Sequence, residues 1–524
     1  MAPPFPAARL VDRLTADPRL AWAAVAGLVL LFAGLCGQRL AGAALWNDEA
    51  FSFFVAWRDL PHTLAFMRQD TQPPVYYLVL TGWLRLGHDV ATLRALSVLA
   101  MLLAVPPLFD AARRLLGVRV ALLAVLLFVL APDNVAWART ARPYALQALF
   151  VAVGFWGFVR IWTQAPRPWA GWLAYVLGGG LAVLTQYPAV FFLLGCNAGM
   201  AVRLAIAWRA GRWREERGLA RVWVLAQAAF VLVWLPWLPD GVRQVASHLT
   251  PGAIAARHTG FLVDAAWVRG VLTGLLAIPR LWRGQFPFVL LSAGIAVAGV
   301  VAFTRAGRGG LPVLAATGVP LLVCLLGWAL VHPVFGYVIY TFQWLRVPYV
   351  MLLAAGLLAL RPRGLGAAAL ALLLLGDVWG LANLQASRNV PLDAVAALLG
   401  AEQHPGDGLL LSTAGATRWG LAYYLGPPYA GRIDGLDIAD TPLEGWAIRT
   451  QARALRQTRL WVVLPDAEGP PFDPAALAPA MTRALHRRFG EVTVDRYDRV
   501  SPGGRAGPPP MRSSTTAIST TEVK

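Results

Sequence analysis

The chain has 524 residues, of which 57% are hydrophobic and 14% are charged, and its mean hydropathy is +0.56. Soluble domains carry roughly 25% charged residues, so this composition excludes a soluble globular protein and indicates a polytopic membrane protein. The net charge of +18 does not indicate nucleic-acid binding, because the only lysine is Lys524 and the arginines are spread over short loops rather than gathered in one patch.

Long apolar runs follow one another from about residue 20 to residue 383. A helix that crosses a bilayer needs about 20 apolar residues, and about eleven runs approach this length. The stretch 265–282 contains Arg269 and Arg280, and it is either a further span or an interfacial helix. The eleven runs lie at roughly 20–44, 92–112, 118–135, 143–163, 170–186, 188–207, 221–238, 286–304, 310–331, 346–361 and 364–383.

Arginines concentrate in alternate loops between these runs, for example at Arg113 and Arg114 and from Arg209 to Arg221. Excess basic charge in short loops marks the cytoplasmic side of a membrane. The N-terminus is therefore predicted to be cytoplasmic and the loop 45–91 extracytoplasmic. Because the number of runs is odd, the segment after residue 384 is predicted to be extracytoplasmic too. Arginine-rich, lysine-poor usage favours a multi-pass protein of a bacterial inner (plasma) membrane.

From residue 384 to residue 500 the composition returns to that of a soluble domain. Short apolar runs bounded by turn residues predict strands, and apolar residues three or four apart predict helices. We therefore expect a small α/β domain, followed over 501–524 by a disordered tail rich in Pro, Gly, Ser and Thr. The expected strands are 408–412, 459–464 and 491–497, and the expected helices are 391–402 and 474–489.

Three acidic residues stand in the first outer loop, directly after the first apolar run. Asp48 and Glu49 are adjacent, and Asp70 precedes a Pro-Pro-Val-Tyr-Tyr segment that ends at Tyr77. Carboxylates at a membrane boundary are costly unless they are paired, solvated or bound to a ligand, so they are candidates for function. Structural alternatives exist for all three: Asp48 as a helix N-cap, Glu49 as a first-turn acid that interacts with the helix dipole, and Asp70 as a turn cap.

Later outer turns add further polar residues at the same membrane face. The turn 132–147 contains Asp133, two arginines and a tyrosine, and another arginine follows in the turn 332–349. A sugar carried on a lipid phosphate would need a general base for the acceptor hydroxyl and cations for the leaving phosphate, which arginine binds in bidentate fashion. Arginines at a membrane edge also pair with lipid headgroups. The residues in question are Arg139, Arg142, Tyr144 and Arg346.

Three motifs occur in order over about residues 45–150. WNDEAFS begins at Trp46, DTQPPVYYLVL begins at Asp70, and ARTARPYALQALF begins at Ala138. They resemble the GT-C superfamily of polytopic glycosyltransferases, most closely the family 39-like group that includes protein O-mannosyltransferases and lipid A aminoarabinose transferases. The remaining spans fit the general layout of that superfamily but carry little specific signal.

The resemblance implies an α-helical GT-C-like transmembrane catalytic domain over 1–383 and the small α/β domain over 384–500. It implies inverting transfer of a hexose or pentose from a polyprenyl-phosphate-linked donor to an acceptor hydroxyl on a glycan, lipid or protein. Asp48 matches the catalytic acid that acts as general base, and Glu49 would support it. Some relatives use a divalent metal, for which Asp48, Glu49 and Asp133 are possible ligands. The positions implied to bind substrate or phosphate are Asp70, Tyr77, Asp133, Arg139, Arg142, Tyr144 and Arg346.

Two other classes of protein remain in competition. A transporter or lipid flippase would place charged residues at mid-bilayer in discontinuous helices, whereas most charges here lie at the ends of the apolar runs. A non-catalytic scaffold that presents the segment 384–500 would not need acids and arginines gathered on one face. We therefore favour the glycosyltransferase, with polytopic transport as the alternative.

Overall fold

A computed structural model describes residues 13–248, 285–306, 309–330, 339–386, 390–404, 406–411, 418–426, 451–466 and 473–500. The stretch 265–282 and the tail 501–524 lie outside these residues, so the expectations for both stay predictions. After residue 389 the chain passes from one compact unit into another, and each unit is described by itself.

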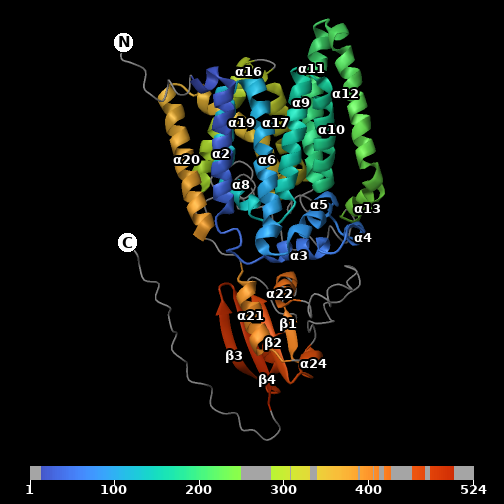
Figure 1. Ribbon diagram of the computed structural model, residues 1–524, viewed down its shortest axis with the longest axis vertical. Coiled ribbons are helices and arrows are strands. Elements are labelled where there is room, and N and C mark those ends of the chain that lie inside the picture. Colours follow the sequence, from blue (N-terminus) through green and yellow to red (C-terminus); the bar gives the residue numbers. More distant parts are fainter. Residues whose placement is uncertain are drawn as a thin grey trace. The chain divides into compact units, whose positions relative to one another are not determined.

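The first unit is a bundle of long apolar helices (Figure 1). Nine helices in its described part are long and apolar enough to cross a membrane, or ten if one bent pair counts as a span. Together with the run 118–135, which is the bent pair, these account for ten of the eleven expected runs, and the remaining run, 310–331, forms the apolar helix α17 (Leu311–Leu330). The long helices are α2 (Pro18–Gly37), α6 (Val90–Leu116), α7 (Val118–Leu130), α9 (Tyr144–Trp162), α10 (Pro168–Thr185), α11 (Val190–Arg209), α12 (Trp213–Trp234), α16 (Gln285–Ala306), α17 (Leu311–Leu330), α19 (Arg346–Ala359) and α20 (Arg363–Ala386).

The run expected at 118–135 breaks because of one proline. Helix α7 ends at Leu130, and α8 (Pro132–Ala138) leaves at an angle of 60° to it. The intervening Ala131 has an extended backbone, with ψ at 117°. A residue before proline is driven out of the helical region, and proline itself fits the first turn of a new helix. The break turns α8 and its acid, Asp133, across the end of the bundle.

Short helices collect at one end of the bundle, where Figure 1 shows α3, α4, α5 and α13. The tight turns that follow α6, α9, α11 and α19 lie at the opposite end, because successive long helices alternate in direction. These turns carry the arginines that the sequence analysis assigned to the cytoplasm. The short elements are α3 (Asn47–Ala56), α4 (Leu60–Gln69), α5 (Val75–Trp83), η1 (Leu84–Leu86), η2 (Tyr187–Ala189), η3 (Leu235–Trp237), α13 (Leu238–His248) and η5 (Ile339–Leu345).

Glycines allow α9 and α10 to pack with their backbones in contact. A Cβ added at Gly178 would lie 2.5 Å from the backbone nitrogen of Gly154 and 2.8 Å from the carbonyl oxygen of Phe150. Small residues permit this close approach, which gives membrane helices their packing energy. Helices α9 and α19 are largely buried within the bundle, whereas α12 is mostly exposed.

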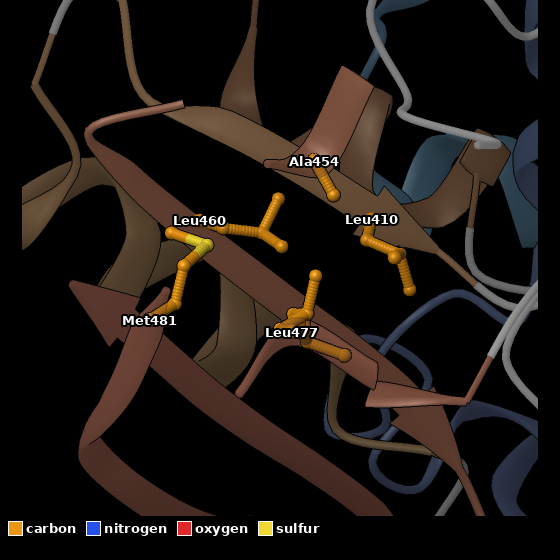
Figure 2. Packing of buried hydrophobic residues seen from close by; sticks show 6 residues of the cluster. Leu410, Ala454, Leu460, Leu477 and Met481 are labelled. Atoms are coloured by element: carbon orange, nitrogen blue, oxygen red, sulfur yellow. The ribbon is translucent and has the colours of Figure 1, made fainter. Parts of the chain in front are cut away.

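The second unit contains a four-stranded sheet with the order β1-β2-β4-β3. Strands β1 (Gly408–Leu411) and β2 (Arg459–Pro465) are parallel, and β4 (Val492–Arg499) pairs antiparallel with both β2 and β3 (Met481–Phe489). Its helical elements are α21 (Leu392–Glu402), α22 (Arg418–Leu425), α24 (Gln451–Ala454) and η7 (Pro474–Leu477). One face of the sheet is covered by a compact apolar cluster, shown in Figure 2, of Leu410, Ala454, Leu460, Val462, Leu477 and Met481.

The helix expected over 474–489 is wrong. The structure has the short η7 and then the strand β3, whose register along β4 shifts between Arg483 and Leu485. Apolar residues four apart, at Leu477, Met481 and Leu485, imitate a helix. Because β3 is an edge strand with a mostly exposed, arginine-rich surface, its side chains do not have to alternate. Pairing with β4 across the tight turn at Gly490 therefore decides the structure, although the apolar spacing of this segment alone favours a helix.

Candidate active site

Glu49 is a buried anchor in the first turn of α3. Arg94 of α6 donates from Nε to one carboxylate oxygen and from Nη2 to the other, both at 2.8 Å. The backbone N–H groups of Ala141 and Trp46 donate to the same carboxylate at 2.8 and 3.3 Å. The Glu49 and Arg94 side chains are only 1% and 3% exposed. These contacts join α3 to α6 and to the turn before α9, so Glu49 connects the first outer loop to the bundle.

Arg94 extends this anchor to the connection between α2 and α3. Its guanidinium also donates to the carbonyl oxygens of Leu40, Ala43 and Ala44, at 2.7, 2.9 and 3.1 Å. Arg94 was not among the residues predicted from the sequence. The available signal was its position at the start of an apolar run, where an arginine is costly unless it has partners.

Asp48, the neighbour of Glu49, lies in a different environment. Its side chain is 46% exposed, and its carboxylate lies 3.6 Å from Nη2 of the buried Arg142. Nη1 of Arg142 also donates to the Asp48 backbone oxygen at 3.3 Å. An accessible carboxylate that lies within hydrogen-bond reach of an acceptor hydroxyl can take its proton as a general base. The structure therefore brings together the acid and one of the arginines that the sequence analysis selected.

Arg142 is almost fully buried, in the turn between α8 and α9. Burial acts to lower its pKa, but interactions with the phenol groups of Tyr77 and Tyr144 and with Asp48 outweigh burial and raise it, so the guanidinium remains charged. It lies 5.9 Å from the centre of the Tyr144 ring. Its Nε has no hydrogen-bond partner in the described part of the chain. This leaves a donor for an anionic ligand.

The Pro-Pro-Val-Tyr-Tyr segment forms one wall near Arg142. Tyr77 is fully buried, and its hydroxyl donates at 3.0 Å to Gln72, which also accepts from Gln186 at 3.2 Å. Asp70 ends α4 close enough to interact with Arg142. Burial raises the pKa of the Asp70 carboxyl above its usual value, while the Thr71 N–H and Arg142 act to lower it. Thus Asp70 and Tyr77 surround the arginine that contacts Asp48.

Asp133 and Arg346 form a second, separate pair. The Arg346 guanidinium contacts the Asp133 carboxylate, and its Nε donates to Gln343 at 3.1 Å. Asp377 of α20 is fully buried and interacts electrostatically with both members of the pair. Asp377 was not predicted from the sequence, although an acid inside an apolar run is a usable signal.

Arg139 lies away from both groups, at the end of α8. Its Nη2 donates to the backbone oxygen of Arg39 at 3.4 Å. Burial, with a further contribution from the nearby positive charges of Arg94 and Arg39, lowers its pKa. The structure thus places Arg139 beside the end of α2 instead of beside Asp48.

The three acids suggested as metal ligands engage three different arginines. Glu49 contacts Arg94, Asp133 contacts Arg346, and Asp48 lies beside Arg142. A hard divalent cation needs several oxygen ligands converging on one point. The described residues contain no group of three or more His, Cys, Asp or Glu side chains placed to hold a metal ion. The donor set suggested from the sequence therefore does not fit a shared cation in this arrangement.

Part of the chain matches a known protein family. Residues 71–237 match the family model described as dolichyl-phosphate-mannose-protein mannosyltransferase. This region includes Tyr77, Asp133, Arg142 and Tyr144, but it begins after Asp48 and Glu49. No protein of curated function matches the chain significantly.

Solved structures resemble almost the whole chain. The apo crystal structure of ArnT from Cupriavidus metallidurans has a TM-score of 0.59 and 15% sequence identity, and the match covers 92% of this chain and 98% of ArnT. The oligosaccharyltransferase of Archaeoglobus fulgidus, solved in complex with Zn and sulfate, has a TM-score of 0.52 and 13% identity, over 84% of this chain and 68% of that one. A second structure of the archaeal enzyme, AglB with an inhibitory peptide and a dolichol-phosphate, has a TM-score of 0.50.

These matches confirm the resemblance and the fold predicted from the sequence. The chain is a multi-pass membrane protein with the GT-C fold of ArnT, followed by a small unit that contains a sheet. At 13–15% identity the structural similarity describes the fold and does not identify a substrate.

Proposed function

We propose that this GT-C-fold protein is a membrane glycosyltransferase that moves a sugar from a polyprenyl-phosphate-linked donor to an acceptor hydroxyl, with inversion at the anomeric carbon. The observation that carries the proposal is the pairing of a half-exposed Asp48 with the buried Arg142 at the end of the bundle that holds α3. The description of the matching family and the dolichol-phosphate bound to AglB support the choice of a polyprenyl phosphate as carrier.

In the proposed reaction Asp48 acts as the general base. Its carboxylate takes the proton of the acceptor hydroxyl as that oxygen attacks the anomeric carbon from the side opposite the phosphate. The bond between the anomeric carbon and the phosphate oxygen breaks, and its electron pair leaves with the polyprenyl phosphate. A positioned general base typically contributes a factor of about 10²–10⁴ to the rate.

Arg142 stabilises the charge that develops on the leaving phosphate. Its guanidinium is nearly fully buried, and its Nε has no partner in the described residues. Donors fixed in a poorly solvated site stabilise developing charge without having to reorganise. Asp70, Tyr77 and Tyr144 surround this guanidinium and would limit how the donor can enter. We assign them to substrate binding on the basis of this proximity.

Glu49 and Arg94 take the role of positioning residues. Their buried contact fixes the first turn of α3, which carries Asp48, against α6 and the turn before α9. Asp133 and Arg346 make a comparable connection between α8 and the start of α19. Arg346 remains a proposed phosphate contact only if a donor can displace Asp133 from it. Arg139 is a weaker candidate because its Nη2 donates to the backbone oxygen of Arg39, away from Asp48.

We propose that the site faces the extracytoplasmic side of a bacterial inner membrane, with the N-terminus in the cytoplasm. The arginine-rich turns at the other end of the bundle support this orientation through the positive-inside rule. The second unit, with its sheet, follows α20 and would then be extracytoplasmic as well. The choice between a hexose and a pentose donor, and the choice of acceptor, depend on the shape of the pocket, and the transfer assay below measures them.

Transfer by the purified full chain from a panel of polyprenyl-phosphate sugars tests the proposal. Asp48→Asn keeps the side-chain shape but removes the base, so we expect transfer to fall by about 10²–10⁴. Asp59→Asn is the matched control, because Asp59 is an exposed N-cap of the neighbouring helix α4 and asparagine also caps helices. Equal transfer by Asp48→Asn and wild type would refute the assignment of the base.

Two further arms of this assay address the alternatives. If wild-type protein consumes no donor in the panel but moves a polyprenyl lipid across a vesicle bilayer, the protein is a transporter and not a transferase. Adding a chelator to active protein tests for a required divalent cation, and we expect full activity because the three suggested acids engage separate arginines.

A further inference from the structure

A cavity of about 270 Å³ lies at the end of the bundle opposite Asp48. It opens where α6 and α9 end, beside the last turns of α11 and the start of α17. Nothing in the proposed reaction uses this end of the molecule. Its lining consists of Arg114, Leu115, Trp162, Thr163, Arg203 and Gly309.

The first wall of the cavity carries an excess of positive charge. Arg113 donates from Nε to one carboxylate oxygen of Asp110, and Arg114 donates from Nε to the other, both at 2.6 Å. Trp156 donates to the same carboxylate at 2.7 Å. One carboxylate thus faces two guanidiniums, which leaves one positive charge in excess. The Arg114 side chain is 25% exposed, so this charge is accessible at the cavity.

The second wall is held rigidly by Arg203, which is nearly buried. Its guanidinium donates to the backbone oxygen of Trp162 at 2.6 Å and to Glu216 at 2.9 Å. It also lies 5.1 Å from the centre of the Trp162 ring. These contacts neutralise Arg203 and fix the shape of the wall, so Arg114 is the residue that brings net positive charge to the lining of the cavity.

Exposed tryptophans locate the cavity relative to the membrane. Trp169, Trp208 and Trp213 are 65%, 69% and 43% exposed, and all three lie at the same end of the bundle as the cavity. Tryptophan is enriched at the level of the lipid headgroups. At this depth the anions nearest to Arg114 are the phosphates of lipid headgroups rather than dissolved anions. Basic pockets between membrane helices on this side bind anionic headgroups.

We propose that this cavity binds the phosphate headgroup of an anionic phospholipid from the leaflet at the arginine-rich end. Arg114 contacts the phosphate, the wall formed by Arg203 and Trp162 shapes the pocket, and the acyl chains remain in the bilayer outside. The cavity is too small for a whole lipid, so only the headgroup and the adjoining glycerol enter it. This binding does not depend on the transferase reaction.

Native mass spectrometry of the full chain in detergent, titrated with dioleoyl-phosphatidylglycerol, tests the proposal. Losing one arginine contact at a membrane surface weakens binding by about 1 kcal/mol, or about fivefold, and we expect this for Arg114→Gln. Arg209→Gln is the matched control, since Arg209 is exposed in the last turn of α11 and does not line the cavity. We expect it to bind as wild type does.

A second variant fills the cavity without altering charge. Thr163→Phe places a large ring at an exposed position on its rim, and we expect it to weaken phosphatidylglycerol binding as Arg114→Gln does. If Arg209→Gln weakens binding as much as Arg114→Gln, the attraction is diffuse and the proposal is wrong. Equal affinity for dioleoyl-phosphatidylcholine would also overturn it. Competition by millimolar inorganic phosphate would assign the cavity to a soluble anion instead.

Discussion

Replacing Glu49 by glutamine should destabilise the membrane unit, whereas replacing Asp48 by asparagine should leave it folded and inactive. Each substitution exchanges one carboxylate oxygen for an amide group of the same shape. At Glu49 the new amide must face a donor, because both carboxylate oxygens accept from Arg94 and one also accepts from the Ala141 N–H. At Asp48 the new amide can turn to solvent, since 46% of the side chain is exposed.

The structure suggests very different magnitudes for the two changes. Removing one partner of a buried ion pair costs about 3–5 kcal/mol, because the remaining charge is left uncompensated. Glu49→Gln strands Arg94, whose side chain is only 3% exposed. An exposed ion pair contributes about 0.2–1 kcal/mol, and the Asp48–Arg142 pair, at 3.6 Å, resembles that case on its Asp48 side.

The assay heats detergent-solubilised full chain in steps and measures the fraction that remains monodisperse by size-exclusion chromatography. We expect the apparent melting temperature to fall clearly for Glu49→Gln and little for Asp48→Asn or the control Asp59→Asn. The double variant Glu49→Gln/Arg94→Met removes the stranded charge and should recover part of the loss. Sugar transfer is measured on the same samples below their melting temperatures.

Two results would contradict this reasoning. A wild-type melting temperature for Glu49→Gln would show that the contact with Arg94 does not hold α3 in place. A stable Glu49→Gln protein that has lost all transfer would instead make Glu49 a group that touches the substrate. Destabilisation of Asp48→Asn as severe as that of Glu49→Gln would mean that Asp48 is a structural cap rather than an accessible base.

Three further predictions concern other parts of the membrane unit. Arg346→Gln removes one partner of the buried pair with Asp133, which should cost about 3–5 kcal/mol of stability and lower the apparent melting temperature. Adding Asp133→Asn removes the unpaired carboxylate and should restore part of the lost stability, as a double-mutant cycle would measure. Burial raises the pKa of Asp70 above 3.8, so the folded wild-type protein loses stability as pH rises from about 4 and the unfolded chain ionises first. Asp70→Asn should therefore gain stability relative to wild type between pH 4 and pH 7. A difference in melting temperature that does not change with pH would contradict this. Gly178→Ala should cost about 1–3 kcal/mol of stability by forcing α9 and α10 apart. Gly27→Ala should cost nothing, because nothing lies within 4 Å of the added Cβ. Melting temperatures of the two variants in detergent measure the difference.

Much of the membrane architecture could be predicted from local patterns. An apolar run of sufficient length must become a helix in a bilayer, because every backbone group has to be satisfied within the segment. The bend at Pro132 was equally readable, since proline disfavours a helical residue before it, although the run was predicted as one span. Strand β3 was not predicted, because the spacing of its apolar residues imitates a helix and only its pairing with β4, the other strand of the same hairpin, makes it extended.

The first-loop acids show where prediction from the sequence stops. The motif around Asp48 and Glu49 indicated a functional carboxylate, and the resemblance to known glycosyltransferases indicated which one. Nothing in the spacing showed that Glu49 would meet Arg94, 45 residues later in the chain. The Asp133–Arg346 pair spans 213 residues, so its formation depends on how α8 and α19 pack. Asp377 joins the same group from α20 for the same reason.

The sequence by itself determined that the chain crosses a membrane many times, which loops share a side, and which acids and arginines could carry chemistry. Hydropathy, arginine placement and short motifs act within one segment or its immediate neighbours, and these properties depend on nothing else. Only the tertiary structure decided which arginine pairs with which acid. Two adjacent carboxylates in one helical turn have different surroundings: Glu49 is buried against Arg94, and Asp48 lies half-exposed beside Arg142. Their different roles follow from this difference in burial.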